Sequence, residues 1–216
     1  RHGRYLDQMS ILEADTASQN VSRTQRQWTR VEMLRDPRFY GVLPVVLAPS
    51  FLNTGLMFHH QHIVLSKGWD LETWYILLMA YAASSIAFSM LAGIIVDRSG
   101  SRPLMPLFTL PMVMGGLILM AGNNDAWIFG VLISFGAASG MTSAVTAPFW
   151  AEVYGVQHLG AIKAVATAVM IFASAMSPAL YGAMFDGGIT IPVIGLLNVV
   201  FVLAASACAW LALRKS

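Results

Sequence analysis

Six runs without Asp, Glu, Lys or Arg follow one another along most of this sequence, and they constrain its fold more than any other feature. The runs are 39–66, 73–96, 103–124, 126–151, 164–185 and 187–213. Each is at least as long as the roughly 20 residues that a helix needs to cross a hydrocarbon core about 30 Å thick. They are apolar throughout rather than alternating, which argues against a transmembrane β-barrel, and inside lipid the backbone must then be helical. The sequence predicts an all-α membrane protein with six transmembrane helices.

Composition supports the same class. Charged residues make up 11% of the 216 residues and hydrophobic residues 56%, whereas an average soluble domain carries about 25% charged residues. This excludes disorder, a coiled coil, a disulfide scaffold and almost any soluble enzyme. The few basic residues lie in the gaps between runs, so we expect the lipid bilayer as a partner and no nucleic acid. The single cysteine, Cys208, permits no internal disulfide.

The distribution of Lys and Arg predicts how the chain threads the membrane. Of the 13 basic residues, all except Lys67 fall in residues 1–38, in the gaps after the second and fourth runs, or in the tail. These segments all face one side, so we expect both termini in the cytoplasm and residues 1–38 to form a polar cytoplasmic leader. Residues 28–35 have the pattern of a short amphipathic helix on the membrane surface, but we favour a solvated linker.

Residues that start or bend helices stand where this threading requires them. Helix starts are expected at Asp36 with Pro37, at Asp70, at Pro103, and at Asn124 or Asp125. Prolines inside the runs predict kinks at Pro44, Pro49, Pro106, Pro111 and Pro178. Such kinks are common in any membrane bundle, and they also suit helices that bend during transport.

A short repeat suggests internal symmetry. The pattern G-x-x-x-D occurs at residues 93–97 and again at 182–186, three runs later. On the predicted topology the two copies face opposite sides of the membrane. This is the pattern of a 3+3 inverted repeat, in which two groups of three helices are related by an axis in the membrane plane.

The gap between the second and third runs holds the most specific motif, Gly-Ile-Ile-Val-Asp-Arg-Ser-Gly-Ser-Arg, at residues 93–102. A carboxylate and two guanidinium groups in so short a turn favour charge-assisted pairing. Gly93 would allow close helix approach, and Gly100 would supply a backbone conformation open mainly to glycine. A charge left in hydrocarbon costs at least about 2.5–3.5 kcal/mol. We therefore place Glu152 at the cytoplasmic end of the fourth helix, near Arg98 or Arg102.

This motif resembles the signature loop of the major facilitator superfamily, G-x-x-x-D-[RK]-x-G-x-[RK]. The matching positions are Gly93, Asp97, Arg98, Gly100 and Arg102, and Pro103 stands where a second basic residue is often found. The resemblance implies a latch that holds the cytoplasmic side closed while the transporter opens outward, and we add Glu152 to it. The alternatives are a merely topogenic basic loop and a plain interfacial glutamate.

Two further stretches resemble bacterial monocarboxylate-like or oxalate/formate-like members of that superfamily. Residues 148–163 look like the loop between helices ten and eleven, and residues 177–186 like the outer part of helix eleven. The leader resembles the loop that joins the two halves of such transporters, and the chain begins with Arg1 rather than Met. The resemblance implies that residues 39–216 are the C-terminal half of the fold, helices seven to twelve, in a bacterial cytoplasmic membrane, with an N-terminal six-helix half as partner.

Polar residues inside the runs are candidates for contact with a substrate or a proton. His59 and His62 share a helix face, and histidine titrates near neutral pH, so proton coupling or anion binding is one interpretation and simple hydration at the outer interface is another. No metal or other cofactor is expected, because His59 and His60 point about 100° apart and no Cys, Asp or Glu is suitably spaced. The other candidates are Asn53, Tyr81, Ser139 and Thr142. Most such groups in membrane helices only pack or bond their own helix, and the small residues at 136–140 predict close helix packing.

We predict a secondary active transporter, a symporter or antiporter, of a small solute, with an organic anion favoured. It would work by alternating access between this half and a second one. The alternative is a self-contained six-helix membrane protein that acts as a homodimeric channel or interaction partner. An intramembrane serine protease is disfavoured, because the last run contains no histidine that could deprotonate Ser139. We therefore expect no enzymatic activity.

Overall fold

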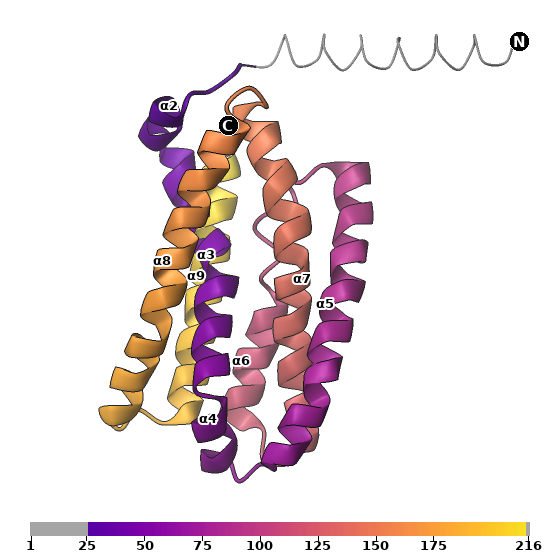
Figure 1. Ribbon diagram of the computed structural model, residues 1–216, viewed down its shortest axis with the longest axis vertical. Helices are drawn as coiled ribbons and strands as arrows, with labels where there is room; N and C mark the ends of the chain where they lie inside the picture. The colour runs from indigo at the N-terminus through magenta and orange to yellow at the C-terminus, as the bar shows by residue number, and fades with distance from the viewer. Residues whose placement is uncertain (1–25, 215–216) are drawn as a thin grey trace, which may run out of the picture.

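The computed structural model describes residues 26–214, and every regular element within that range is an α-helix (Figure 1). The elements are α2 (Arg30–Arg35), α3 (Pro37–Phe58), α4 (His60–Ser66), α5 (Leu71–Ser99), α6 (Pro111–Ala121), α7 (Ala126–Tyr154), α8 (Leu159–Asp186) and α9 (Ile191–Arg214). The prediction of an all-α protein is confirmed.

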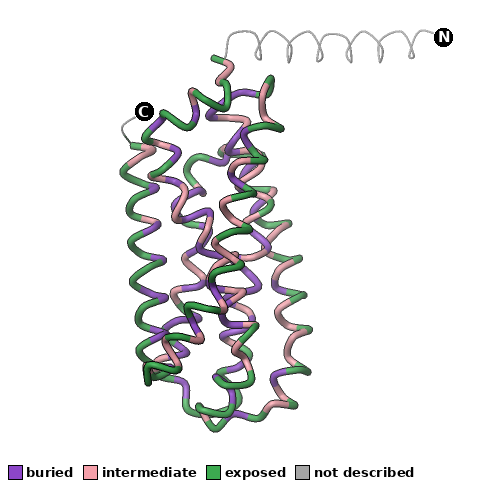
Figure 2. Tube along the Cα trace, turned by 60° about the vertical axis from the view of Figure 1, so that its left-hand side comes forward, coloured by how far each residue is buried: buried purple, intermediate pink, exposed green. Residues whose placement is uncertain are grey.

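Five helices, α3, α5, α7, α8 and α9, are long and apolar enough to cross a membrane. α3 and α8 run in one direction along the bundle and α5, α7 and α9 in the other, because the short helix α6 returns the chain between α5 and α7; α2 lies at the same end as the end of α9 (Figure 1). Figure 2 shows buried and exposed positions alternating along each helix, so each one turns a stripe toward its neighbours and another outward. The exposed stripes are rich in large apolar side chains, as a lipid-facing surface requires. The chain is an integral membrane protein.

The third predicted span is not one continuous helix. Only α6 is regular, and residues 102–110 before it form a series of turns. Pro103, Pro106 and Pro111 lie within nine positions of one another, and each lacks a backbone donor and clashes with the preceding turn. The interior of α3 contains two prolines, five positions apart, and those of α7 and α8 contain one each, and these helices remain continuous.

The first predicted span is also divided. α3 ends at Phe58, and His59, with φ −106° and ψ 14°, separates it from α4. Two of the predicted helix starts are confirmed by side-chain caps, whereas the start predicted at Pro103 is wrong, because residues 102–110 form turns and α6 begins at Pro111. The side chain of Asp36 accepts from the N–H of Arg38 at the start of α3, and that of Asp70 accepts from the N–H of Thr73 at the start of α5.

The segment before α3 is a docked helix, so the solvated linker that we favoured is wrong. Thr29 and Glu32 form a reciprocal capping box at the start of α2, which satisfies two backbone donors that the first turn leaves free. Met33 is completely buried in the bundle. The ring of Trp28 packs edge-on against that of Tyr154, with centroids 5.5 Å apart, and the backbone N–H of Trp28 donates to the backbone carbonyl of Tyr154. The segment is therefore held against the end of α7.

The helices pack as two groups. α5 lies along α7, and α3 lies along α8 and α9, while α6 bridges α7 and α9; α7 and α8 touch each other little. A Cβ atom at Gly136 or Gly140 would collide with backbone carbonyls of α5, so the close helix packing predicted at residues 136–140 is confirmed. Burial follows this arrangement. In the most apolar stretch of α7, 61% of the residues are buried, whereas only 11% are buried in the corresponding stretches of α5 and α8.

Candidate functional site

A polar cavity of about 370 Å³ lies between α3, α7 and α8. Its lining residues are Pro49, Ser50, Asn53, Thr54, Ser139, Thr142, Ser143, Thr146, Met170 and Ser174. Seven of these ten carry a hydroxyl and one carries an amide, and none is charged. The cavity therefore offers hydrogen bonds without a fixed charge.

Helical spacing brings these side chains to common faces. Residues three and four positions apart lie on one side of a helix. On α7 this spacing aligns Ser139, Thr142, Ser143 and Thr146, and on α3 it aligns Ser50, Asn53 and Thr54. Ser50, Thr54, Ser143 and Thr146 were not among the predicted candidates, although the same spacing in the sequence identifies them.

Asn53 is the most constrained polar residue of the cavity. Its Nδ2 donates to the phenolic oxygen of Tyr81 on α5 at 2.7 Å. Its Oδ1 is buried and has no hydrogen-bond partner within residues 26–214. Leaving such an acceptor unpaired costs about 1–3 kcal/mol, so this atom is suited to accept from a solute or a water molecule.

Several hydroxyls of the cavity already use their protons. Thr142 donates to the carbonyl of Ala138, and Thr146 to that of Thr142, at 2.8 and 2.7 Å. The hydroxyls of Thr54 and Ser174 lie 2.7 Å apart and join α3 to α8. Because the protons of Thr142 and Thr146 are engaged, these two oxygens present acceptor sites, whereas one hydroxyl of the Thr54–Ser174 pair keeps its proton.

The histidines lie away from this cavity. His59 stacks on Tyr181 with ring centroids 6.2 Å apart, and its Nδ1 is 3.2 Å from the Gly55 carbonyl. His62 is exposed and packs on Phe185 at 4.4 Å. Of the six predicted candidates, Asn53, Ser139 and Thr142 line the cavity. Tyr81 does not line it but is hydrogen-bonded to Asn53. The two histidines are not among the lining residues. Within residues 26–214 no cluster of three metal-ligating side chains occurs.

His62 lines a separate hollow of about 400 Å³ near the end of α4, together with Lys67. The Nζ of Lys67 donates to the Met120 carbonyl at 3.4 Å and lies over the ring of Trp69. Burial lowers the pKa of Lys67, because removing water disfavours the charged form. This hollow lies at the opposite end of the bundle from α2 (Figure 1).

The charged turn after α5 is fastened to α7. Gly100 adopts φ +79° and ψ 171°, a region essentially restricted to glycine, as predicted for a tight turn. The N–H of Ser101 then donates to both carboxylate oxygens of Glu152, at 2.9 and 3.1 Å. A guanidinium nitrogen of Arg102 donates to the backbone carbonyl of Glu152 at 3.4 Å. Glu152 thus lies at this turn, as expected, and the backbone of Ser101 meets its carboxylate.

The remaining motif residues face outward. Asp97 and Arg98 are exposed, and neither forms an ion pair within the described part of the chain. A Cβ atom at Gly93 would meet nothing within 4 Å. The close helix approach expected at Gly93 is therefore not made inside residues 26–214.

The comparisons with known proteins agree with this architecture. Residues 32–216, which include all the long helices and the charged turn, match the family model of the Major Facilitator Superfamily. A search of curated proteins found no match. Because the family model covers most of the sequence, the chain belongs to the Major Facilitator Superfamily, whose members are membrane transporters of small solutes.

Proposed function

We propose that this chain is the C-terminal six-span half of a secondary active transporter that carries a small polar solute by alternating access. The observation that carries the proposal is the uncharged cavity that contains Asn53, with its unpaired Oδ1. A buried acceptor without a hydrogen-bond partner is costly to keep, so the Oδ1 of Asn53 is the atom of this cavity that would gain most from a donor on a solute. Discontinuous or bent helices are typical of transporters, and residues 102–110 and His59 interrupt helices here, away from the cavity.

The exposed faces of α5 and α8 support an N-terminal six-helix half as the partner. Small residues recur along the exposed face of α8, namely Ala164, Ala168, Ala175, Ala179 and Ala183. In lipid, small residues allow the backbones of two helices to approach closely. A second half packed here would put the cavity between the halves, and residues 1–38 would form the loop that joins them.

The signature residues fit a latch at the cytoplasmic end in this proposal. Gly100, Arg102 and Glu152 hold the turn to α7 from within this chain. Gly93, Asp97 and Arg98 face outward, where helices of the other half would meet them. The excess of basic residues at this end makes it cytoplasmic under the positive-inside rule.

The narrower proposal of an organic anion needs a cation from outside the cavity, because no lining residue is charged. This positive charge would come from His59 or from the N-terminal half of the transporter. The free Oδ1 of Asn53 and the engaged threonine hydroxyls favour a solute that also carries N–H or O–H donors. An organic acid that also carries a hydroxyl group meets both requirements.

Uptake by the full-length transporter tests this function. A panel of organic acids, sugars and drugs first identifies a substrate. Asn53→Ala then lowers uptake at least tenfold at equal membrane abundance, whereas Asn123→Ala, an exposed asparagine in the turn before α7, leaves it unchanged. Normal uptake by both Asn53→Ala and Ser139→Val contradicts the proposal. Transport by this chain alone, reconstituted without another half, favours the self-contained homodimer instead.

Proton coupling through His59 is a separate part of the proposal. We expect His59→Gln to alter the pH dependence of uptake, because glutamine keeps hydrogen-bonding capacity but does not titrate near neutral pH. An unchanged pH profile would make His59 a packing residue against Tyr181.

A further inference from the structure

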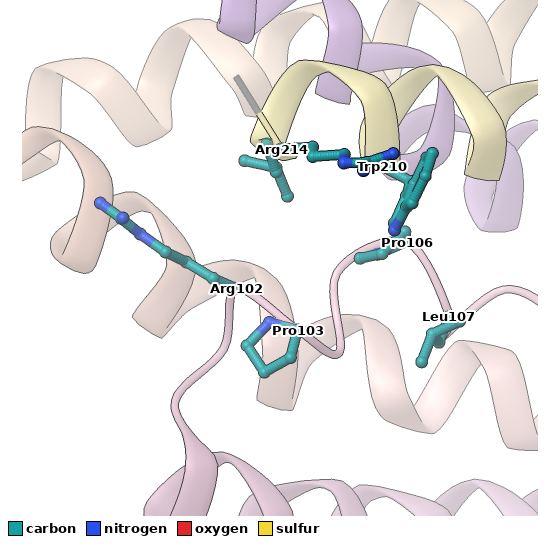
Figure 3. Close-up of a pocket in the computed structure, with 7 residues that line it drawn as sticks. Arg102, Pro103, Pro106, Leu107, Trp210 and Arg214 are labelled. Atoms are coloured by element: carbon teal, nitrogen blue, oxygen red, sulfur yellow. The ribbon is translucent and has the colours of Figure 1, made fainter. Parts of the chain in front are cut away.

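A second cavity, of about 500 Å³, opens at the end of the bundle that carries α2 and the end of α9. Figure 3 shows it between the irregular segment after Arg102 and the last turn of α9. Pro103, Pro106 and Leu107 form one wall, and Trp210 lies opposite them. The cavity plays no part in the proposed solute pathway.

Two of the closely spaced prolines, Pro103 and Pro106, explain why the cavity exists. A regular helix would pack along α9 without a gap, but Pro103 and Pro106 prevent one, and the chain bends away instead. The side chains around the opening remain exposed, with 50% of Leu107 and 49% of Trp210 accessible. In a membrane protein such an opening on the outside of the bundle faces lipid.

Two arginines flank this apolar wall. The guanidinium of Arg214 lies 5.0 Å from the centre of the Trp210 ring, and Figure 3 shows it above the cavity at the end of α9. Arg102 starts at the other rim and extends toward α7. Trp and Arg together mark the depth of the lipid headgroups.

An apolar wall below a cationic rim suits an amphiphile with an anionic head. We propose that this cavity binds an acidic phospholipid of the surrounding leaflet. Its acyl chain lies against Pro106, Leu107 and Trp210, and its phosphate is held by Arg214. Basic pockets between membrane helices on the cytoplasmic side recognise acidic headgroups in this way. A free anion would gain nothing from the apolar wall.

Native mass spectrometry of the full-length protein in detergent tests the proposal. Dioleoyl phosphatidylglycerol and dioleoyl phosphatidylcholine are added separately, so that only the headgroup differs. We expect the first phosphatidylglycerol molecule to bind more tightly than phosphatidylcholine. Arg214→Gln weakens that first binding step about fivefold, the change expected for one arginine near a lipid surface. Arg35→Gln, which removes another exposed arginine from the same end, leaves it unchanged.

Further variants separate binding from folding. Arg214→Lys keeps the charge and retains most of the binding, so a loss in Arg214→Gln alone is not a general unfolding of α9. Brominated phosphatidylglycerol quenches the fluorescence of the parent protein more than that of Trp210→Phe. Equal binding of both lipids, or equal losses in Arg214→Gln and Arg35→Gln, overturns the proposal. Displacement of the lipid by glycerol 3-phosphate also overturns it, because the site would then hold a free anion.

Discussion

The N–H of Ser101 donates to both carboxylate oxygens of Glu152, which lies 51 positions further along the chain. This contact fastens the charged turn after α5 to the end of α7. The same helix α7 carries Ser139 and Thr142 on the wall of the polar cavity. The signature turn and the candidate solute site are therefore attached to one helix.

Glu152→Ala should lower the free energy of unfolding by about 1.5 kcal/mol, because a hydrogen bond to a charged acceptor is lost. Glu152→Gln should cost less, since its amide oxygen still accepts one bond from Ser101. Equilibrium unfolding in mixed micelles measures both. Equal stability of the parent and Glu152→Ala would show that the contact does not stabilise the turn.

Asp97→Asn and Gly93→Ala should change the free energy of unfolding of this half by less than about 0.5 kcal/mol, because neither position has a partner to lose inside residues 26–214. Both should reduce uptake by the full-length transporter without changing membrane insertion. Vesicle uptake and insertion are compared for each variant. Normal uptake by Asp97→Asn would contradict the proposal that this turn acts as a latch.

Gly140→Ala should destabilise the bundle by about 1–3 kcal/mol, because the added methyl group collides with the Ser85 carbonyl and forces α5 from α7. Gly160→Ala is the matched control, since a Cβ atom there meets nothing within 4 Å. Thermal unfolding of the two variants separates packing from helix propensity. Equal melting temperatures would contradict the close contact of α5 and α7.

The docking of α2 should weaken in acid. Hydrogen bonds from the N–H and hydroxyl of Thr29, and then from Arg26, hold the pKa of Glu32 below its ordinary value of 4.5. A lowered pKa means that the carboxylate stabilises the fold above pH 4.5 and that this contribution is lost as the pH falls through the lower, folded-state pKa. Trp28 fluorescence, obtained by difference from Trp28→Phe, should report this transition. Its persistence in Glu32→Gln would assign it to another group.

The long helices could be predicted from the sequence because a span in lipid needs only a charge-free run of sufficient length. The residues of the short helix α2 have an amphipathic pattern, but they could not decide between a helix and a solvated linker. Its capping box, Thr29 to Glu32, is visible in the sequence, but six residues do not form a stable helix alone. The burial of Met33 and the contact of Trp28 with Tyr154 supply the missing stabilisation.

The candidate site was predictable one helix at a time. Spacing places Ser139 and Thr142 on one face of α7, but which helix lies opposite depends on tertiary packing. For the same reason the sequence could not show that Asn53 lines the cavity and that His59 does not. The ring of His59 stacks on Tyr181 of α8 instead. The break at His59 could not be predicted either, because no proline or glycine stands at that position.

The sparse contact between α7 and α8 has a mechanical consequence. The polar cavity lies along this line, whereas α5 packs closely on the glycines of α7 on one side, and α3 packs closely with α8 and α9 on the other. We expect this half to yield most easily along the line between α7 and α8, because the two groups are joined elsewhere through α6, which contacts both α7 and α9. A solute that widens the cavity would then separate the groups along that line while α6 keeps them joined.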